Sequence, residues 1–264
     1  MKTVCFFLSL WAALTTSQAA VVTKPVTYEH GGVGYVGYLA YDDAQISAAR
    51  PAPGVLVIHE WWGLNTFVKE KAEALAKLGY VAFAPDMYGA GVSTEDPRQA
   101  GAWAGPFYEG KLNMAERAQA GLDQLLATGL VTPQKVAAIG FCFGGSVAQS
   151  LAYAGAPLAG VVSFHGNPIV PTREQAAAIK GKVLICHGAI DPHVKPDQLD
   201  ALLAAYDAGK VDYTFISYAG ALHAFTNPDA THISQTFKMP GIGYHEEVAR
   251  RAWQHMKDLF AEIL

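Results

Sequence analysis

The sequence predicts an α/β domain whose central sheet is mainly parallel and is covered by helices on both faces. Short apolar runs of strand length recur along the chain, and segments with apolar residues at helical spacing separate them. Hydrophobic residues make up 51% of the 264 residues, which is enough material for a substantial core. This length fits one large α/β domain as well as two small ones, and the unbroken alternation of strands and helices favours a single domain over residues 20–264.

The expected elements begin with a hairpin, because residues 26–29 and 35–41 alternate in polarity around Gly31 and Gly32. Apolar runs predict the later strands, at 54–59, 80–85, 136–139 and 159–164 and at the starts of the segments 182–191 and 213–220. Helical spacing and end signals such as Gly79 predict helices at 65–78, 112–128, 173–179, 196–208 and 245–264. Residues 87–110 are expected to form a loop, rich in glycine and aromatic residues, that could cover a site.

The first nineteen residues predict a secretory signal peptide. Lys2 gives a positive start, residues 4–14 are a compact apolar run, and Ser17-Gln18-Ala19 fits a small-x-small cleavage site. We therefore expect export across the inner membrane to the periplasm, with an uncleaved N-terminal anchor as the alternative. No later segment reaches the ~18 apolar residues of a membrane span.

Charge and histidine spacing exclude other classes of partner. The formal net charge is only −4 and no basic block is present, so nucleic-acid binding is not expected. The histidines near residue 191, His187 and His193, match no compact metal-ligand motif, and we expect neither a metal site nor a cofactor.

The segment 138–146 carries the most specific chemical signal. An apolar strand leads into Gly140-Phe-Cys142-Phe-Gly144-Gly145, and an alanine-rich helix follows. This is the nucleophile-elbow pattern with cysteine in place of serine, in which a tight strand-to-helix turn exposes the central side chain at a helix N-terminus. The helix dipole favours the thiolate, the nucleophilic form of the side chain. A buried structural cysteine in a glycine-rich turn is the alternative for Cys142.

Two further residues follow in the order that the elbow pattern requires. Asp191 ends the apolar segment that starts at Lys182, and His223 lies in a loop after the strand that starts at Tyr213. Nucleophile, acid and histidine in this order are typical of the α/β-hydrolase fold, which places all three at one edge of the sheet. His223 would take the thiol proton and Asp191 would orient the imidazole. The alternatives are a loop-capping aspartate and a solvated loop histidine.

The other cysteines leave one alternative open. Cys5 lies in the predicted signal peptide, so the mature chain keeps Cys142 and Cys186. An exported protein with two cysteines could pair them, and a regulatory disulfide remains possible. Cys186 lies within an apolar strand, however, where we expect it to be buried.

Several motifs together resemble the dienelactone hydrolase family. Glu60-Trp-Trp-Gly-Leu-Asn65, Pro85-Asp-Met-Tyr88, the elbow at 140–145, Asp191 and Gly220-Ala-Leu-His-Ala-Phe225 carry the resemblance, which runs over roughly residues 25–264. It implies a carboxylic ester or lactone hydrolase with an α/β-hydrolase fold, similar to carboxymethylenebutenolidase, that needs no cofactor.

The resemblance also implies roles for individual residues. The acid at the position of Glu60 contacts the resting nucleophile in that family and holds the thiol neutral until substrate arrives, which would also limit oxidation of Cys142. The backbone N–H groups of Trp61 and Phe143 would form the oxyanion hole. For Glu60 the alternative is a loop acid that caps the helix starting near Asn65.

The expected substrate pocket departs from the best-known members of the family. Those members bind a lactone carboxylate with two arginines, one of them four residues after the catalytic histidine, where this chain has Asn227. Arg98 is the candidate for the second arginine. Asparagine cannot replace the charge or the bidentate fork of arginine, so dienelactone itself is disfavoured as the substrate. The aromatic residues of this region favour a more apolar pocket formed by Trp61, Trp62, Tyr88, Trp103 and Phe107.

The sequence thus predicts a secreted, thiol-dependent ester or lactone hydrolase that forms a thioester on Cys142. We expect a small-molecule substrate and a monomer or small homo-oligomer. Two other classes remain as alternatives: a thiol redox or stress protein that uses Cys142 and Cys186, and a non-catalytic binding protein on a hydrolase fold.

Overall fold

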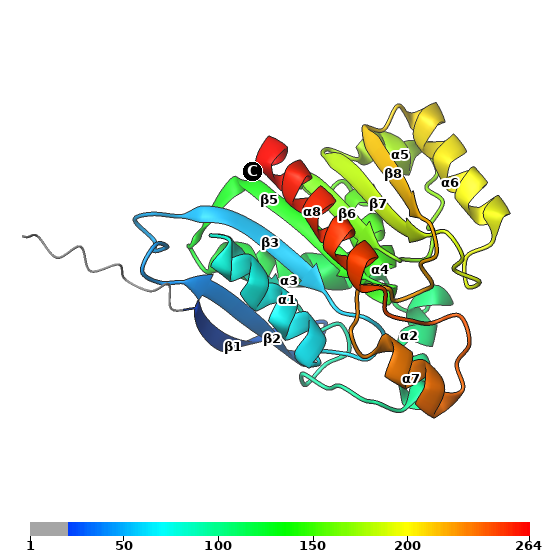
Figure 1. The fold of residues 1–264 in the computed structure, drawn as a ribbon. Coiled ribbons are helices and arrows are strands. Elements are labelled where there is room, and N and C mark those ends of the chain that lie inside the picture. The colour runs from blue at the N-terminus through cyan, green and yellow to red at the C-terminus, as the bar shows by residue number, and fades with distance from the viewer. Residues whose placement is uncertain (1–20) are drawn as a thin grey trace, which may run out of the picture.

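An eight-stranded sheet forms the centre of the protein, and helices pack on both of its faces (Figure 1). A computed structural model describes residues 21–264; the predicted signal peptide at 1–19 lies outside the described residues. The strand order is β1-β2-β4-β3-β5-β6-β7-β8. The strands are β1 (Val21–His30), β2 (Val33–Asp42), β3 (Ala52–Ile58), β4 (Val81–Ala84), β5 (Val131–Phe141), β6 (Gly160–Phe164), β7 (Lys182–Gly188) and β8 (Tyr213–Tyr218).

The direction of the strands confirms the predicted fold class. β1 pairs with β2 as an antiparallel hairpin, and β2 pairs antiparallel with β4. All pairs from β4 to β8 are parallel. The carboxyl ends of β3, β5, β6, β7 and β8 therefore meet at one edge of the sheet, and this edge is where such folds bind ligands.

Two hydrophobic layers hold the helices to the sheet. Along β3, Leu56 and Ile58 pack with the layer of α3, α4 and α6, whereas Val55 and Val57 pack with the layer of α1 and α8. This follows from the two-residue period of a strand, which sends neighbouring side chains to opposite faces. The helices are α1 (Thr66–Lys77), α2 (Pro97–Tyr108), α3 (Met114–Ala127), α4 (Phe143–Tyr153), α5 (Arg173–Ala178), α6 (Pro196–Gly209), α7 (Ala230–Phe237) and α8 (Glu246–Ile263).

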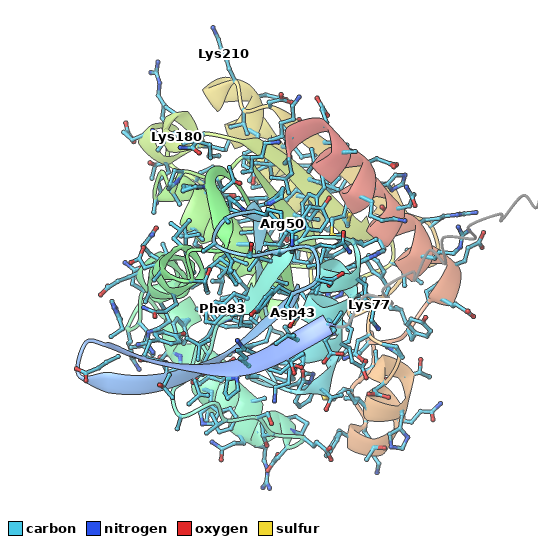
Figure 2. All side chains as sticks on the ribbon, turned by 90° about the vertical axis from the view of Figure 1, so that its left-hand side faces the viewer. Asp43, Arg50, Lys77, Phe83, Lys180 and Lys210 are labelled. Atoms are coloured by element: carbon cyan, nitrogen blue, oxygen red, sulfur yellow. The ribbon has the colours of Figure 1, made fainter. Side chains whose placement is uncertain are left out.

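Most apolar side chains of the strands are buried, and charged side chains at helix ends are exposed. Phe83 of β4 is fully buried beneath the hairpin, whereas Lys210 at the end of α6 points into solvent (Figure 2). No helix within residues 21–264 is long and apolar enough to cross a membrane.

Two helices were not expected from the sequence. The segment 87–110, predicted to be a loop, contains α2, which begins after Asp96 caps the backbone N–H of Arg98 and Pro97 fills the first turn. α7 follows the predicted histidine loop and has only one buried residue, Ala230. Both helices lie at the same end of the sheet (Figure 1), beyond the carboxyl ends of the strands.

Candidate active site

Cys142 stands in a sharp turn between β5 and α4. Its backbone is in the left-handed region, with a φ of 53°, which is strained for a residue with a side chain. A Cβ atom at Gly140 would lie 1.9 Å from the Gly144 carbonyl oxygen, and one at Gly144 would lie 2.3 Å from the Ile58 carbonyl oxygen. Only glycine fits these two positions, so the spacing of the motif follows from the close passage of the backbone. The turn leaves the Cys142 side chain half-buried at the sheet edge.

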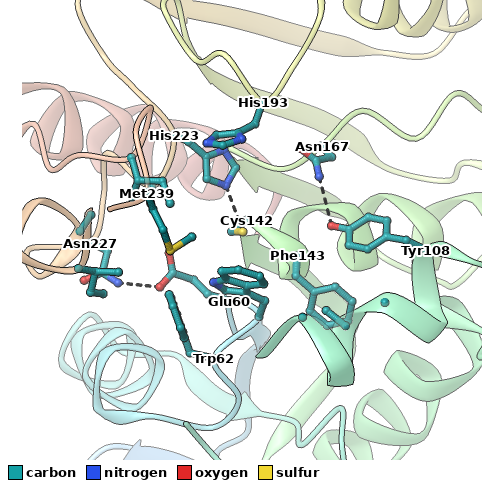
Figure 3. Close-up of a pocket in the computed structure, with 18 residues that line it drawn as sticks. Glu60, Trp62, Tyr108, Cys142, Phe143, Asn167, His193, His223, Asn227 and Met239 are labelled. Carbon is teal, nitrogen blue, oxygen red and sulfur yellow. Dashed lines mark hydrogen bonds between the residues drawn. The ribbon is translucent and has the colours of Figure 1, made fainter. Parts of the chain in front are cut away.

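His223 and Asp191 lie in line with this sulfur. The Nε2 atom of His223 is 3.1 Å from the Cys142 Sγ atom (Figure 3). Its Nδ1 atom donates to Asp191 Oδ2 at 2.7 Å. His223 follows β8 and Asp191 follows β7, and both side chains are buried. Asp191 is itself held by the backbone N–H of His193, which donates to Oδ1 at 2.9 Å. The three predicted residues are therefore brought together in the order sulfur, imidazole, carboxylate.

The electrostatics of this chain favour a charged imidazole. Burial alone would lower the pKa of His223, but the adjacent Cys142 sulfur and the hydrogen bond to Asp191 raise that pKa to about 10. Burial also opposes ionisation of Asp191, and its hydrogen bond to His223 outweighs this and lowers the pKa of the carboxyl. An imidazolium in contact with a cysteine sulfur stabilises the thiolate form of that side chain.

Glu60 lies two residues after the end of β3, in the same pocket as Cys142 (Figure 3). Its side chain is buried, and Oε2 accepts a 2.6 Å hydrogen bond from the Asn227 carboxamide. Burial raises the pKa of Glu60 to about 7, and the bond from Asn227 only partly offsets this rise. The hydrogen-bond partner that the structure gives Glu60 is thus Asn227, although the carboxyl and the Cys142 sulfur line the same pocket.

The pocket is a cavity of about 300 Å³ with Cys142 in its wall. Tyr108, Asn167 and His193 are among the polar residues of its lining (Figure 3). Its apolar lining includes Trp61, Trp62, Ala230, Ile233, Met239 and Ile242. A cavity of this size and mixed lining is typical of sites for small organic molecules.

Three of the predicted pocket residues line this cavity, namely Trp61, Trp62 and Asn227, and Phe143, which was predicted for the oxyanion hole, lines it as well. Tyr88, Trp103 and Phe107 do not line it. They pack together behind its wall: the Tyr88 ring lies 5.4 Å from Trp103, 6.2 Å from Phe107 and 5.7 Å from Phe143. Tyr88 also donates from its hydroxyl to the Trp61 carbonyl at 3.0 Å, so this aromatic cluster supports the pocket from outside.

Arg98 lies away from the cavity. Its side chain is 93% exposed and pairs with Asp96 at the N-terminus of α2, at 3.2 Å. A guanidinium held in this way cannot reach a substrate beside Cys142. Among residues 21–264, no arginine lines the pocket.

Sequence reasoning missed several residues of the site. Ile233 and Met239 belong to α7 and the segment after it, which carry no strong motif. His193 was considered only as a metal ligand, although its position two residues after Asp191 places it in the same loop. His165 was missed as well; its place directly after β6 was the available signal, since that strand ends at the same sheet edge.

The second cysteine of the described chain is remote from the first. Cys186 is fully buried in β7, with its sulfur 3.6 Å from the Tyr218 hydroxyl, and burial raises its pKa to about 12. In the sheet, Phe141 pairs with Phe164 and Phe164 pairs with Cys186. Two strand spacings separate the cysteines by about 10 Å, which exceeds the ~7 Å limit between the Cα atoms of a disulfide. Both thiols are free. Within residues 21–264 no group of three or more potential metal ligands comes together.

Comparison with known proteins places most of the described chain in one family. The model of the dienelactone hydrolase family matches residues 37–264. A putative carboxymethylenebutenolidase of Aquifex aeolicus is 31% identical over 244 residues, which cover 90% of this chain and 98% of that protein.

Solved structures agree with the sequence relatives. A structure named m3DLH superposes with a TM-score of 0.86 at 36% identity and covers 93% of this chain and 99% of its own. A dienelactone hydrolase-like promiscuous phosphotriesterase, P91 from metagenomic libraries, gives the same TM-score and identity, with 92% and 99% covered.

Proposed function

This chain belongs to the dienelactone hydrolase family, a family of ester and lactone hydrolases, and from that premise we propose that it hydrolyses small neutral esters or lactones through a thioester on Cys142. The observation that carries the proposal is the linear contact of Cys142 Sγ, the His223 imidazole and the Asp191 carboxylate at 3.1 and 2.7 Å. A purely structural cysteine needs no such pair of buried partners.

The reaction follows from this geometry. His223 takes the proton of Cys142, and the thiolate attacks the carbonyl carbon of the ester. The C–O bond then breaks, His223 gives its proton to the departing alkoxide, and the acyl group remains as a thioester. Water, deprotonated by His223, cleaves the thioester and returns the thiol. With a lactone the leaving hydroxyl stays on the product, which is a hydroxy acid.

The tetrahedral oxyanion needs fixed donors near the sulfur. We assign this role to the backbone N–H groups of Trp61 and Phe143, because Phe143 directly follows the nucleophile as the first residue of α4 and Trp61 follows Glu60 at the end of β3. One such donor contributes about 3–4 kcal/mol in serine hydrolases. Asp191 keeps His223 in the tautomer that presents Nε2 to the sulfur.

The environment of Glu60 supports a neutral substrate. The carboxyl is held by an uncharged amide, and its raised pKa keeps a share of it protonated near neutral pH. A substrate carboxylate would meet Glu60 without a compensating arginine in this pocket. We propose that Glu60 disfavours the free thiolate until a neutral ester displaces water from the cavity.

The proposal is tested by turnover of p-nitrophenyl butyrate and of a panel of small lactones. Wild type and Cys186→Ala are expected to turn over at similar rates, because Cys186 is buried two strands away. The turnover rate of Cys142→Ala should fall by about 1000-fold or more, as it does in hydrolases when the nucleophile is removed. Equal turnover by Cys142→Ala would contradict the proposal.

A second candidate substrate class is the neutral phosphotriester. The relative P91 is described as a promiscuous phosphotriesterase, and the pocket of this chain offers an apolar wall and an uncharged partner for Glu60. Turnover of a p-nitrophenyl dialkyl phosphate that is lost in Cys142→Ala would establish this activity.

The alternatives from the sequence make different predictions. A redox switch between Cys142 and Cys186 requires backbone movement to close about 10 Å, and it would shift electrophoretic mobility with reductant. A binding protein would show no turnover in the ester panel with a folded wild type.

We also propose export. Residues 1–19 carry the pattern of a signal peptide, so the mature chain would begin at Ala20 and act in the periplasm. Intact mass of the protein from a periplasmic extract tests both the site of cleavage and the compartment.

A further inference from the structure

A second buried histidine lies beside the proposed catalytic one. His165 directly follows β6, is fully buried, and has a φ of 41°, which is in the left-handed region that non-glycine residues rarely adopt. Its backbone N–H donates to the Cys186 carbonyl at 2.8 Å, which fixes the turn to β7. Its ring lies 5.5 Å from the His223 ring and 5.1 Å from Phe225. A strained backbone that persists at this place suggests a role for the side chain.

The two ring nitrogens of His165 have different partners. Nδ1 accepts a hydrogen bond from the backbone N–H of Cys142 at 3.1 Å, and Nε2 is 2.6 Å from the Thr226 hydroxyl. Because a backbone N–H can only donate, Nδ1 carries no proton. Burial, together with the charge on His223, keeps the pKa of His165 well below its usual value. The ring is therefore neutral, its proton is on Nε2, and Nε2–H donates to Thr226 Oγ1.

These two bonds join two different loops. Cys142 belongs to the turn after β5, and Thr226 is the third residue after His223 in the loop after β8. Backbone bonds also tie the histidine loop to residues 241–245 and to the loop of Asp191: His223 N–H donates to Gly241, Gly243 N–H to His223, His245 N–H to Phe225, and Ile190 N–H to Ala221. The His165 ring thus links the loop of the histidine to the turn of the nucleophile.

We infer that His165 is a positioning residue: its ring fixes the distance between the turn of Cys142 and the loop of His223, so that sulfur and Nε2 meet within hydrogen-bonding distance. The inference rests on the proposed thiol hydrolase. Neither His165 nor Thr226 lines the substrate cavity. Losing their bond should therefore lower kcat and the population of the thiolate, and leave KM nearly unchanged.

Thr226 offers the cleanest test, because valine has its shape without its hydroxyl and serine keeps the hydroxyl. For Thr226→Val we expect kcat on p-nitrophenyl butyrate to fall about tenfold, as for one lost hydrogen bond, with KM within about twofold. The pH midpoint of the 240 nm thiolate absorbance should rise, since the imidazole no longer sits firmly against the sulfur. Thr226→Ser should restore both quantities to near the wild-type values.

A second variant removes the other end of the link. His165→Asn keeps a residue that tolerates a positive φ but is too short to reach Thr226. It should match Thr226→Val within about twofold, and the double variant should be no slower than either single one, because both remove the same link. Additive losses in this cycle would contradict the inference.

The outcomes separate the inference from the proposed function. Wild-type kcat and thiolate titration in Thr226→Val would overturn the positioning role, and so would equal losses in the valine and serine variants. If wild type itself hydrolyses no ester, the proposed function fails. In that case the thiolate titration still reports on the contact between His223 and Cys142, and an unchanged midpoint in Thr226→Val overturns the role of His165.

Discussion

Asn227, four residues after His223, donates a 2.6 Å hydrogen bond from its carboxamide to the buried carboxyl of Glu60. A charged partner at this position would hold Glu60 ionised. The neutral amide instead leaves burial as the dominant influence, and the pKa of Glu60 rises to about 7. This contact links the departure from the family pattern to a measurable property of the site.

The first prediction concerns stability and pH. Unfolded Glu60 loses its proton near its ordinary pKa of 4.5, whereas the folded carboxyl keeps it up to about pH 7, so the folded state loses stability as pH rises through this interval. Glu60→Gln should remove this loss and be about 3 kcal/mol more stable than wild type at pH 8, with little difference at pH 4. Urea unfolding of both proteins at pH 4 and pH 8 measures this difference in the free energy of unfolding. An equal difference at both pH values would mean that the carboxyl titrates normally.

The second prediction concerns Asp191, the acid of the proposed triad. Asp191→Asn should lower kcat by about 1000-fold or more, because the amide no longer stabilises the imidazolium and allows the wrong tautomer. Asp197→Asn, at an exposed position at the start of α6, is the matched control and should stay within about twofold of wild type. Ester turnover at pH 8 separates the two. Similar losses in both variants would point to a general effect of removing charge.

A third prediction follows from the tight turn at Cys142. Gly140→Ala would force a methyl group against the Gly144 carbonyl, so we expect a loss of about 3 kcal/mol in the free energy of unfolding together with loss of turnover. Gly34→Ala in β2 meets nothing within 4 Å and should change neither. Thermal unfolding followed by circular dichroism gives the comparison. Normal stability in Gly140→Ala would show that the turn can open.

The fourth prediction compares Trp62 and Arg98, which were both predicted to line the pocket and of which only Trp62 does so. Trp62→Ala removes part of the apolar wall and should raise KM for p-nitrophenyl butyrate by about tenfold, in line with about 1.5–3 kcal/mol for a large apolar side chain. Arg98→Ala should leave kcat and KM unchanged, because that side chain is exposed and pairs with Asp96. A rise in KM for Arg98→Ala would mean that α2 turns toward the pocket during turnover.

The sequence predicted the sheet, and the grouping of Cys142, Asp191 and His223 at one edge of it, for physical reasons. Strands buried on both faces appear as short apolar runs, and the close backbone passage at Cys142 demands glycines at fixed positions. The positions of Asp191 and His223 follow from the rule that loops after parallel strands share one edge.

The pocket was harder to predict. α7 has only 8 residues, so the helical spacing of Ala230, Ile233 and Phe237 is too short a pattern to identify a helix from the sequence. Whether Tyr88, Trp103 and Phe107 face the substrate or stand behind the wall depends on packing, which composition does not encode. The role of His165 depends on a contact between segments 61 residues apart in the chain, and no local sequence pattern predicts such a contact.

The placement of α2 and α7 has a consequence for how this protein can change over time. Cys142, Asp191 and His223 lie in the segments that follow sheet strands, whereas part of the cavity wall comes from these two helices, α2 between β4 and α3 and α7 between β8 and α8. Substitutions, and even changes of length, in the helices can alter which molecules enter without disturbing the strands that hold the chemistry. New specificities are therefore open to this scaffold by exchanging two peripheral segments, and a chimera that carries α2 and α7 from a relative would inherit that relative's selectivity on an unchanged reaction centre.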